Sequence, residues 1–516
     1  MSPHTSFSII IWFTFVFVAA LSTSGTTTSA VCHQANNRIP NRIWYPSSLA
    51  YNESLSSYFS AQEAELRPLC IFSPENVSEL SNFVKLISKD HGYGQAGTQA
   101  PQYAVRSGGH TPWAGAANIE GGITVDLRSM DSVVLSPDLK MASLGAGSIW
   151  SDIYSHLAPF NLSVMGGRVV GVGVGGFLTG GGISILSRQN GWACDNIYGY
   201  EVVLASGEIV YATASSHPDL WLSLKGGSNN FGIVTRFDVP TWPLSKLWGG
   251  ALSFNYTPSI VDAHSQGFSD FMDPINFDDA ASMFFALFYA STGRTRTVLD
   301  VLFYARPVTK PTIFDPFTSI ETPNSNTLRL ASVSDIVSEQ PGSLPREANW
   351  WVAFSGRDRR DKMLTTRISA FYTTFTFKNA GKSVYNELIE IWEDITDTLG
   401  DVKSLNLGIL FQPLPVTNGT NSLGLPVGET DLVLAALTSS YERRSDDDTV
   451  LKAMQAIQAG MEVVLRKEGL LVPFQYLNYA YQTQDPIGSY GATSKARLQK
   501  VSRNNLKLSL QARLGH

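Results

Sequence analysis

The first stretch whose residues could do chemistry is the hexapeptide Arg106-Ser107-Gly108-Gly109-His110-Thr111. Its glycines allow backbone N–H groups to turn toward an anion such as a phosphate. The two hydroxyl side chains add hydrogen-bond donors, and the arginine adds a positive charge. An imidazole at the edge of such a turn could bind a metal, act as a base or bond covalently to a cofactor. A glycine-rich surface turn with an incidental histidine is the alternative that these six residues leave open.

A second candidate site is the run from Met165 to Gly182, which holds 9 glycines in 18 residues. Such a run cannot form a plain helix, because each interior glycine costs up to about 1 kcal/mol relative to alanine. Its backbone can instead form a wall against a flat ligand. The segment Gly171–Gly176 also satisfies G-x-G-x-x-G, and Asp195 follows at about the spacing of a ribose contact in a Rossmann site. No hydrophobic strand precedes the motif, however, and glycines at 180–182 interrupt the helix that should follow it.

Length and charge limit the class of protein. A chain of 516 residues is expected to form one very large domain or two to three ordinary ones. Its formal net charge is −6 and its isoelectric point is about 5.8. This balance argues against binding to nucleic acid or to an anionic membrane surface.

The N-terminus has the pattern of a secretory signal. An apolar run from Ile9 to Leu21, broken only by Thr14, is too short to span a bilayer and is typical of a signal-peptide core. Small residues follow and end in Thr28-Ser29-Ala30, where we expect cleavage; an uncleaved anchor is the alternative. Five N-x-S/T triplets agree with secretion and predict glycans at Asn52, Asn76, Asn161, Asn255 and Asn418.

Three cysteines occur in the chain, an odd number that suggests one disulfide and one free thiol. Cys32 and Cys70 lie near the mature N-terminus and flank a polar segment, so we expect them to pair. In the chain-entropy model such a loop closure stabilises by about 4 kcal/mol. Cys194 is expected to be buried and free.

Strands and helices alternate in the first half of the chain. After a loop-rich arm up to about residue 66, periodicity predicts the following elements: a helix over 77–89, strands over 103–106 and 123–127, a helix over 148–157 capped by Ser148, a hairpin over 201–210, a helix over 217–224 and a strand ending at Val239. We place a domain boundary near residue 243.

The middle of the chain has a different pattern. Alternating or aromatic-rich segments predict strands over 248–256, 282–291, 298–305, 404–411 and 431–441, with helices over 361–375, 383–399 and 448–468. Strands with helices segregated to one face indicate an antiparallel α+β layer. Six aromatic residues on these strands could line a pocket or form core: Phe284, Phe285, Phe288, Tyr289, Phe303 and Tyr304.

Four motifs in order make the chain resemble the berberine bridge enzyme-like branch of FAD-linked oxidases with a PCMH-type flavin domain. They are RSGGHTPWAG (106–115), VGVGGFLTGGGISILSRQNGWACDNI (172–197), GGSNNFGIVTRF (226–237) and YLNYAYQTQDP (476–486). The resemblance implies an α+β fold in segments: a signal peptide over 1–30, an arm over 31–66, a two-subdomain FAD-binding domain over 67–243, an antiparallel-sheet substrate domain over 244–468 and a C-terminal segment over 469–516 that returns to the flavin domain. The tail from Asn504 to His516 departs from the family pattern, which puts its packing in doubt.

The resemblance also implies the cofactor and its contacts. Residues Arg106, Ser107, Gly108, Gly109 and Thr111 would wrap the FAD pyrophosphate, and His110 would carry the flavin 8α-methyl group covalently. The implied backbone contacts are Gly173, Gly175, Gly176, Gly181, Gly232 and Ile233. Some members add a second bond from a cysteine, but the matching position here is Val169, so we predict one covalent link. A metal is not expected, because no ligand cluster accompanies His110.

The C-terminal motif would supply the flavin-facing side of the catalytic site. Tyr476 and Asn478 resemble flavin contacts, and Tyr479 best matches the catalytic base. A phenol, with an ordinary pKa near 10, is a poor base at neutral pH unless a cation or hydrogen bonds favour the phenolate. A buried aromatic side chain is the alternative for Tyr479. Gln412, at the end of a predicted strand, could hydrogen-bond the substrate or be an ordinary strand-end residue.

These expectations together describe a secreted, monomeric FAD-linked oxidase. It would transfer hydride from a small organic molecule of secondary-metabolite type to flavin and then pass electrons to O₂, giving H₂O₂. The alternatives are a carbohydrate oxidase, a flavin dehydrogenase with another acceptor, and a flavin- or ligand-binding protein without turnover. We expect no nucleic-acid partner and no stable membrane association after signal cleavage.

Overall fold

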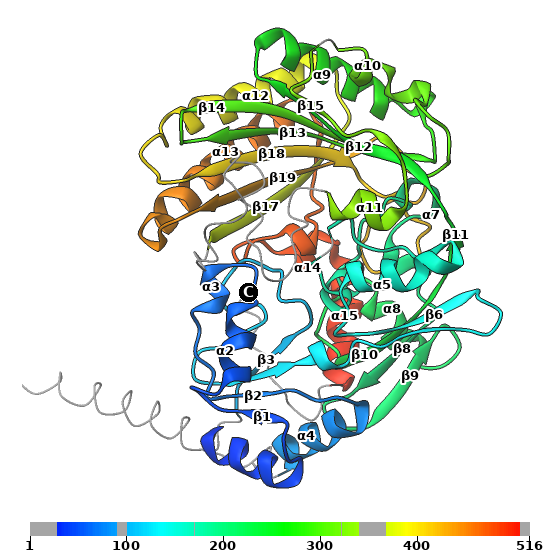
Figure 1. Ribbon diagram of the computed structural model, residues 1–516, viewed down its shortest axis with the longest axis vertical. Coiled ribbons are helices and arrows are strands. Elements are labelled where there is room, and N and C mark those ends of the chain that lie inside the picture. The colour runs from blue at the N-terminus through cyan, green and yellow to red at the C-terminus, as the bar shows by residue number, and fades with distance from the viewer. Residues whose placement is uncertain (1–27, 90–100, 170, 321, 340–367, 506–516) are drawn as a thin grey trace, which may run out of the picture.

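The computed structural model describes residues 28–89, 101–169, 171–320, 322–339 and 368–505 (Figure 1). The predicted signal core, Val170 and the tail from residue 506 lie outside these ranges. No helix within them is long and apolar enough to cross a membrane. All five sequon asparagines are exposed.

The arm before residue 66 is helical, so the expectation of a loop-rich arm is wrong. It contains a helix over 28–38, α2 (Leu49–Ser56) and α3 (Ala61–Ala64). Serine residues cap the N-termini of α2 and α3. The Ser48 side chain accepts a hydrogen bond from Tyr51 N, and the Ser60 side chain accepts one from Glu63 N. Cys32, on the first helix, forms the expected disulfide with Cys70.

A small sheet holds the hexapeptide at its edge. Its order is β1-β2-β4-β3, with β2, β4 and β3 parallel and β1 antiparallel. The bounds are β1 (Ile43–Trp44), β2 (Cys70–Phe72), β3 (Tyr103–Arg106) and β4 (Ile123–Asp126), with α4 (Val77–Lys89) following β2. Since β3 ends at Arg106, the turn that follows lies at the carboxyl end of a parallel strand.

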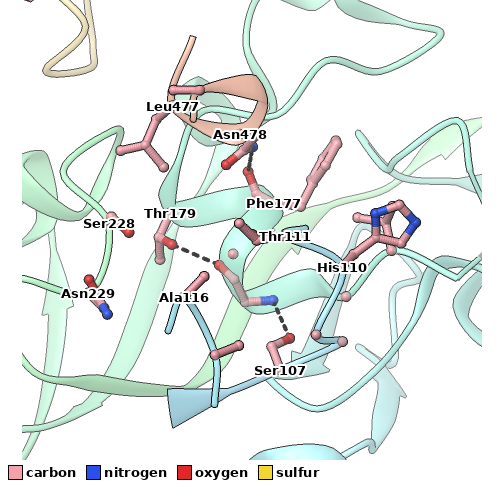
Figure 2. A pocket seen from close by; sticks show the side chains of 18 of the residues that line it. Ser107, His110, Thr111, Ala116, Phe177, Thr179, Ser228, Asn229, Leu477 and Asn478 are labelled. Atoms are coloured by element: carbon pink, nitrogen blue, oxygen red, sulfur yellow. Dashed lines mark hydrogen bonds between the residues drawn. The ribbon is translucent and has the colours of Figure 1, made fainter. Parts of the chain in front are cut away.

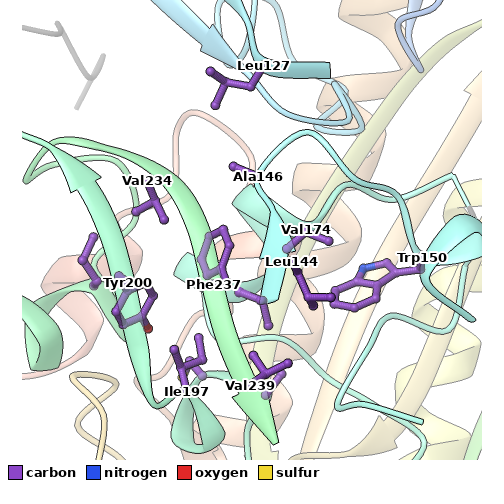
Figure 3. Packing of buried hydrophobic residues seen from close by; sticks show 14 of the residues in the cluster. Leu127, Leu144, Ala146, Trp150, Val174, Ile197, Tyr200, Val234, Phe237 and Val239 are labelled. Carbon is purple, nitrogen blue, oxygen red and sulfur yellow. The ribbon is translucent and has the colours of Figure 1, made fainter. Parts of the chain in front are cut away.

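A second, antiparallel sheet has the order β5-β6-β10-β8-β9. Its strands are β5 (Val133–Leu135), β6 (Met141–Gly145), β8 (Gly199–Val203), β9 (Ile209–Thr213) and β10 (Ile233–Pro240), and β8 and β9 form the predicted hairpin. Figure 3 shows Leu144 and Phe237 of this sheet beside Trp150 and Val174 in one buried cluster. Cys194 lies in the same core and is free, as expected.

The predicted Ser148 cap is wrong. Helix α5 (Trp150–Leu157) begins after Ile149, and the Ser148 hydroxyl is buried with no hydrogen-bond partner among the described residues. The backbone here pairs with the glycine-rich run instead: Trp150 N donates to Val172 O and Val174 N donates to Ser148 O. This pairing fixes the start of the helix without a side-chain cap.

The large sheet has nine strands, in the order β15-β12-β14-β13-β18-β19-β17-β20, with β16 also paired to β12. Their bounds are β12 (Leu247–Asn255), β13 (Ala281–Ala290), β14 (Thr295–Tyr304), β15 (Ser325–Asn326), β16 (Arg329–Ala331), β17 (Ser369–Lys378), β18 (Asn406–Pro413), β19 (Leu432–Tyr441) and β20 (Leu471–Val472). Helices α9 (Pro258–Met272), α12 (Lys382–Asp397) and α13 (Asp447–Lys467) cover one face, at the top of Figure 1. This arrangement confirms the antiparallel α+β layer.

The predicted helix over 361–375 is wrong from residue 369 onward, where the chain forms β17; residues 361–367 lie outside the described ranges. Residues 369–378 read SAFYTTFTFK, and β-branched and aromatic residues favour strands. Phe371, Phe375 and Phe377 pack in the core between the sheet and its helices. Packing on both sides of the strand therefore outweighs the helical spacing in this segment.

The C-terminal segment packs against the first half of the chain. The Tyr490 hydroxyl donates to Gly226 O, and the Ser502 hydroxyl donates to Asn230 O. Helix α15 (Ala492–Asn505) contacts α8 (Pro218–Leu224). The remaining elements are α6 (Val174–Thr179), α7 (Ser187–Asn190), α10 (Asp315–Thr318), α11 (Val333–Ser338), α14 (Pro486–Ser489), β7 (Leu162–Ser163) and β11 (Trp242–Pro243).

Candidate active site

A cavity of about 880 Å³ lies between the glycine-rich segments and the face of the large sheet that the helices leave uncovered. Its walls come from the hexapeptide turn, the start of α6, the loop at 228–233, strands β13, β18 and β19, and the segment 476–487. Figure 2 shows Ser107 and His110 of the turn, Thr179 of α6 and Asn478 of the C-terminal segment around this space. The sequence motifs, far apart in the chain, thus border one cavity.

Strand alternation decides which predicted aromatic residues reach the cavity. Phe284 and Phe288 on β13 line it. Phe285 and Tyr289, on the opposite face of the same strand, lie in the core against the helices. Successive side chains point to opposite faces of a sheet, so both interpretations of these aromatics hold, each for one face.

The hexapeptide turn is fixed through the Ser107 side chain, and residues 107–111 border the cavity. The Ser107 hydroxyl donates to Ala146 O at 2.6 Å and accepts from Gly175 N at 3.0 Å. Among the described residues, no group accepts from the backbone N–H groups of residues 108–111. Buried backbone donors normally find partners, so these N–H groups provide a site for anionic oxygens of a ligand.

Two glycines bring the turn and the glycine-rich run into direct contact. A Cβ at Gly173 would lie 2.2 Å from Gly108 N, and a Cβ at Gly108 would lie 2.5 Å from Gly173 N. Either side chain would separate the two backbones. Gly176 differs, because a Cβ there would meet no protein atom within 4 Å and would occupy the cavity wall.

The Arg106 side chain does not reach the cavity. It is 1% exposed, donates from Nη1 to Ser54 O at 2.6 Å and lies over the Tyr58 ring. The nearby carboxylate of Asp126, 4.0 Å from Nη1, supplies the opposite charge, and both Arg106 and Arg128 help to hold the pKa of Asp126 low against the effect of burial. Its guanidinium therefore anchors the arm to β3, and the prediction that its charge faces a pyrophosphate does not fit this placement.

His110 borders the cavity and stacks on Phe59, with ring centroids 4.2 Å apart and planes at 20°. Burial lowers the pKa of His110 to about 4, outweighing the opposing hydrogen bond to its own backbone. The imidazole is therefore neutral at physiological pH and keeps a free electron pair on one ring nitrogen. Phe59 was missed by the sequence reasoning, because it lies in the arm, 51 positions before His110.

Most of the other predicted cofactor contacts line the cavity, namely Thr111, Gly175, Gly232 and Ile233, and so does Val169. Gly181 does not; its φ is +121°, and a Cβ there would lie 3.0 Å from the Trp192 ring and 3.3 Å from the Tyr476 ring. Its role is thus to admit these two rings behind the wall.

The C-terminal motif contributes three cavity residues with different surroundings. The Tyr476 hydroxyl accepts from Gly182 N at 3.1 Å and from Asn478 Nδ2 at 2.9 Å, and burial raises the pKa of Tyr476 above its ordinary value. Asn478 Nδ2 also donates to Phe177 O (Figure 2). Tyr476 is thus a neutral phenol that fixes the backbone of the glycine wall.

Arg168 is the functional candidate that sequence reasoning missed. Its Nη2 lies 2.6 Å from Gln412 Oε1 and 3.4 Å from the Tyr479 hydroxyl, and its guanidinium stacks over Phe284 at 4.1 Å. Arg168 is 5% exposed and borders the cavity, whereas Gln412 is fully buried behind it. The available signal was that Arg168 is the sole charged residue in the run from 165 to 182.

The residues present fit FAD. Unused N–H donors at 108–111 suit a pyrophosphate, and the open face of Gly176 admits a flat ring where any side chain would intrude. Apolar side chains from β13, β14 and β18 line the opposite wall, where a substrate would lie.

Comparisons with known proteins agree. Residues 68–213 match the family model described as FAD binding domain. The FAD-dependent monooxygenase tpcD of Cochliobolus heterostrophus is 34% identical over 479 residues, which cover 89% of this chain and 85% of that protein. The FAD-dependent monooxygenase sdcF of Emericella nidulans is 34% identical over 492 residues, covering 92% and 95%.

Solved structures share the fold at low sequence identity. A variant of berberine bridge enzyme superposes with a TM-score of 0.71 at 15% identity, over 92% of this chain and 96% of that one. A glucooligosaccharide oxidase of Acremonium strictum, described with a 6-S-cysteinyl, 8α-N1-histidyl FAD, gives 0.71 at 17% identity over 93% and 96%. On the matched domain and the two relatives, the chain belongs to the family of FAD-dependent oxidoreductases that includes tpcD and sdcF, and it shares the fold of berberine bridge enzyme.

Proposed function

We propose that the protein is an oxidase that oxidises a small, largely apolar organic molecule at the expense of O₂. The observation that carries this proposal is that Arg168 contacts both Tyr479 and Gln412 beside an apolar cavity. The glycine-rich run, to which Arg168 belongs, borders the same cavity. Bound FAD would accept a hydride from a substrate C–H bond and pass the two electrons to O₂, which yields H₂O₂.

Within this site Tyr479 acts as the base that takes the substrate hydroxyl proton. Arg168 places a positive charge beside the phenolic oxygen, with its Nη2 3.4 Å away. No carboxylate of a described residue forms an ion pair with Arg168, so its charge is not neutralised elsewhere. Gln412 holds the guanidinium by accepting at 2.6 Å, which makes it a positioning residue and not a direct substrate contact.

His110 carries the covalent link in this proposal. Its neutral imidazole borders the cavity and can supply a nitrogen to the flavin 8α position. Val169 stands where a second, cysteinyl link would require sulfur, and Cys194 is buried elsewhere in the core. The glucooligosaccharide oxidase is described with both links; we propose that this chain forms the histidyl link alone.

The experiment has two readouts on the purified full-length protein. H₂O₂ release is measured over a panel of aromatic alcohols and sugars, with and without an artificial electron acceptor. Release with apolar alcohols supports the proposal, release with sugars supports a carbohydrate oxidase, and turnover only with the artificial acceptor supports a dehydrogenase. Yellow flavin that stays on acid-denatured wild type but not on His110→Ala supports the tether.

A second candidate, monooxygenation, is favoured by the names of the two relatives. The two functions differ in the fate of oxygen. Turnover under ¹⁸O₂ leaves the product unlabelled if the protein is an oxidase, whereas a monooxygenase places one ¹⁸O atom in the product. Flavin reduction by NADPH is measured in parallel, because a monooxygenase of an unactivated substrate needs that reductant.

We also propose that the chain is secreted. The Cys32–Cys70 disulfide and the exposure of all five sequon asparagines support this. Expression in a secreting eukaryotic host, with and without an N-glycosidase, tests it through the protein found in the medium and the shift in its mass.

A further inference from the structure

The segment Ser57–Glu63, which runs from the end of α2 into α3, contacts the hexapeptide turn through Phe59 and Ser60. Phe59 N donates to Gly109 O at 3.1 Å, and the Ser60 hydroxyl donates to Pro112 O at 2.6 Å. Between these two bonds the Phe59 ring lies flat on the His110 imidazole. The arm is thus hydrogen-bonded to the chain on both sides of His110.

The same segment is tied to the large sheet. Ala61 N donates to Ile368 O at 2.9 Å, and Ala370 N donates to the Gln62 side chain at 3.2 Å. The Phe59 ring also lies 5.9 Å from the Tyr372 ring on β17. Phe59 is therefore fixed by two parts of the fold and can hold the ring that it touches.

His110 itself has few other restraints. Within the described part of the chain, the His110 imidazole makes no ring contact other than the stack on Phe59. The His110 side chain also forms no hydrogen bond with another described residue. A stacked aromatic pair contributes about 0.5–1.5 kcal/mol beyond its buried area. Without that contact the imidazole can rotate about its side-chain bonds toward the open cavity.

We propose that Phe59 is a positioning residue for cofactor attachment: its ring holds the His110 imidazole in the orientation from which the histidyl–flavin bond forms. The proposal rests on the proposed role of His110 as the tether. In that bond the imidazole nitrogen joins the flavin 8α-carbon in place of one hydrogen. One proton leaves that carbon and another leaves the imidazole, the two electrons of the broken C–H bond reduce the flavin, and O₂ then takes up two electrons and two protons to give H₂O₂. A nucleophile that is already held in the reactive orientation accelerates such a step, because the entropy cost of orienting it is not added to the barrier.

Burial beneath Phe59 supports this role, because it keeps the imidazole neutral and its nitrogen nucleophilic. Tyr372, whose ring lies 5.9 Å from the Phe59 ring, has its pKa raised by burial and carries no charge at neutral pH. A smaller side chain at 59 would admit water and return the pKa of His110 toward its ordinary value.

The test compares Phe59→Leu with Phe59→Tyr, which keeps the ring. Flavin-depleted full-length protein is mixed with FAD, and acid-stable flavin is followed over time from pH 5 to pH 8. We expect Phe59→Tyr to match wild type and Phe59→Leu to incorporate flavin roughly two- to tenfold more slowly. Only Phe59→Leu should slow further as pH falls below 6.5. Incorporation by Phe59→Leu at the wild-type rate and with the wild-type pH profile would overturn the proposal.

Two further variants separate positioning from general damage and from failure of the tether. His110→Ala and His110→Ala/Phe59→Leu should bind FAD reversibly with equal affinity; a weaker double variant would show that Phe59 shapes the binding site itself and would overturn the proposal. If wild type releases all flavin in acid, the tether is refuted and this inference with it. If wild type retains flavin and Phe59→Leu behaves as wild type, this inference alone fails.

Discussion

Nη2 of Arg168 lies 3.4 Å from the phenolic oxygen of Tyr479, and the same nitrogen lies 2.6 Å from Oε1 of Gln412. The guanidinium thus lies between the phenol that we propose as the base and an amide oxygen that fixes it. Burial of an arginine without a carboxylate partner is costly, and burial accordingly lowers the pKa of Arg168. The placement makes sense if the charge is used at the phenol.

Replacing Tyr479 by Phe should lower kcat by about 10²–10⁴, the usual contribution of a general base, without loss of flavin.

Arg168→Met keeps a long apolar side chain over Phe284 but removes the charge. We expect its kcat to fall, because the phenolic oxygen loses the cation that lies 3.4 Å from it, while the flavin stays bound. Steady-state kinetics check this; Arg168→Met with the wild-type kcat contradicts it.

Gly176→Ala and Gly173→Ala form a matched pair. At Gly176 the new methyl group meets no protein atom, and alanine favours the α6 helix by up to about 1 kcal/mol. The flavin-depleted protein should therefore be as stable as wild type or more so, while FAD binding weakens. At Gly173 the methyl group would lie 2.2 Å from Gly108 N, so the fold itself should lose stability. Thermal unfolding with and without FAD measures both; equal FAD affinity in Gly176→Ala and wild type would contradict the assignment of the wall.

The titration of Glu63 should make the stability of the folded protein depend on pH. Its carboxylate accepts from Ala117 N at 2.6 Å, its other oxygen has no partner among the described residues, and burial raises its pKa to about 7. A carboxyl whose pKa is higher in the folded state stabilises that state most at low pH. This contribution, on the order of 3 kcal/mol, is lost as pH rises from about 4.5 to about 7.

Glu63→Gln removes that titration. The unfolding free energy of the variant minus that of wild type should therefore increase with pH across this window. Urea unfolding at pH 4.5 and at pH 8 gives the two differences. A difference that does not change with pH would mean that Glu63 keeps an ordinary carboxyl titration in the folded protein.

The buried pair of His264 and Asp300 should couple α9 strongly to β14, on the face of the large sheet that the helices cover. His264 Nε2 lies 2.8 Å from Asp300 Oδ2, both side chains are fully buried, and His264 Nδ1 donates to Ile260 O. Asp300→Ala should cost about 3–5 kcal/mol of unfolding free energy, because it leaves a buried imidazole without its partner. The double variant with His264→Ala should cost clearly less than the two single costs combined; additive costs would show that the pair does not interact.

Local signals explain most of what could be predicted. The hexapeptide follows a strand, the hairpin over 199–213 has its turn residues in place, and alternation identified β13 and its neighbours. The failures were also local in origin. The helix expected over 361–375 ignored the strand preference of Thr and Phe in 369–378, and the Ser148 cap ignored the pairing of that backbone with the glycine run.

The sequence by itself determined the disulfide and the layered α+β architecture, because these follow from spacing and composition along the chain, and its four motifs indicated FAD through their resemblance to a known family. Only the tertiary structure decided where charge lies. It turned Arg106 away from the cavity toward Ser54 and Asp126, and it brought Arg168 to Gln412 and Tyr479, which are 244 and 311 positions away. The direction of a side chain on a strand and the approach of distant segments follow from packing of the whole fold, and no local pattern encodes them.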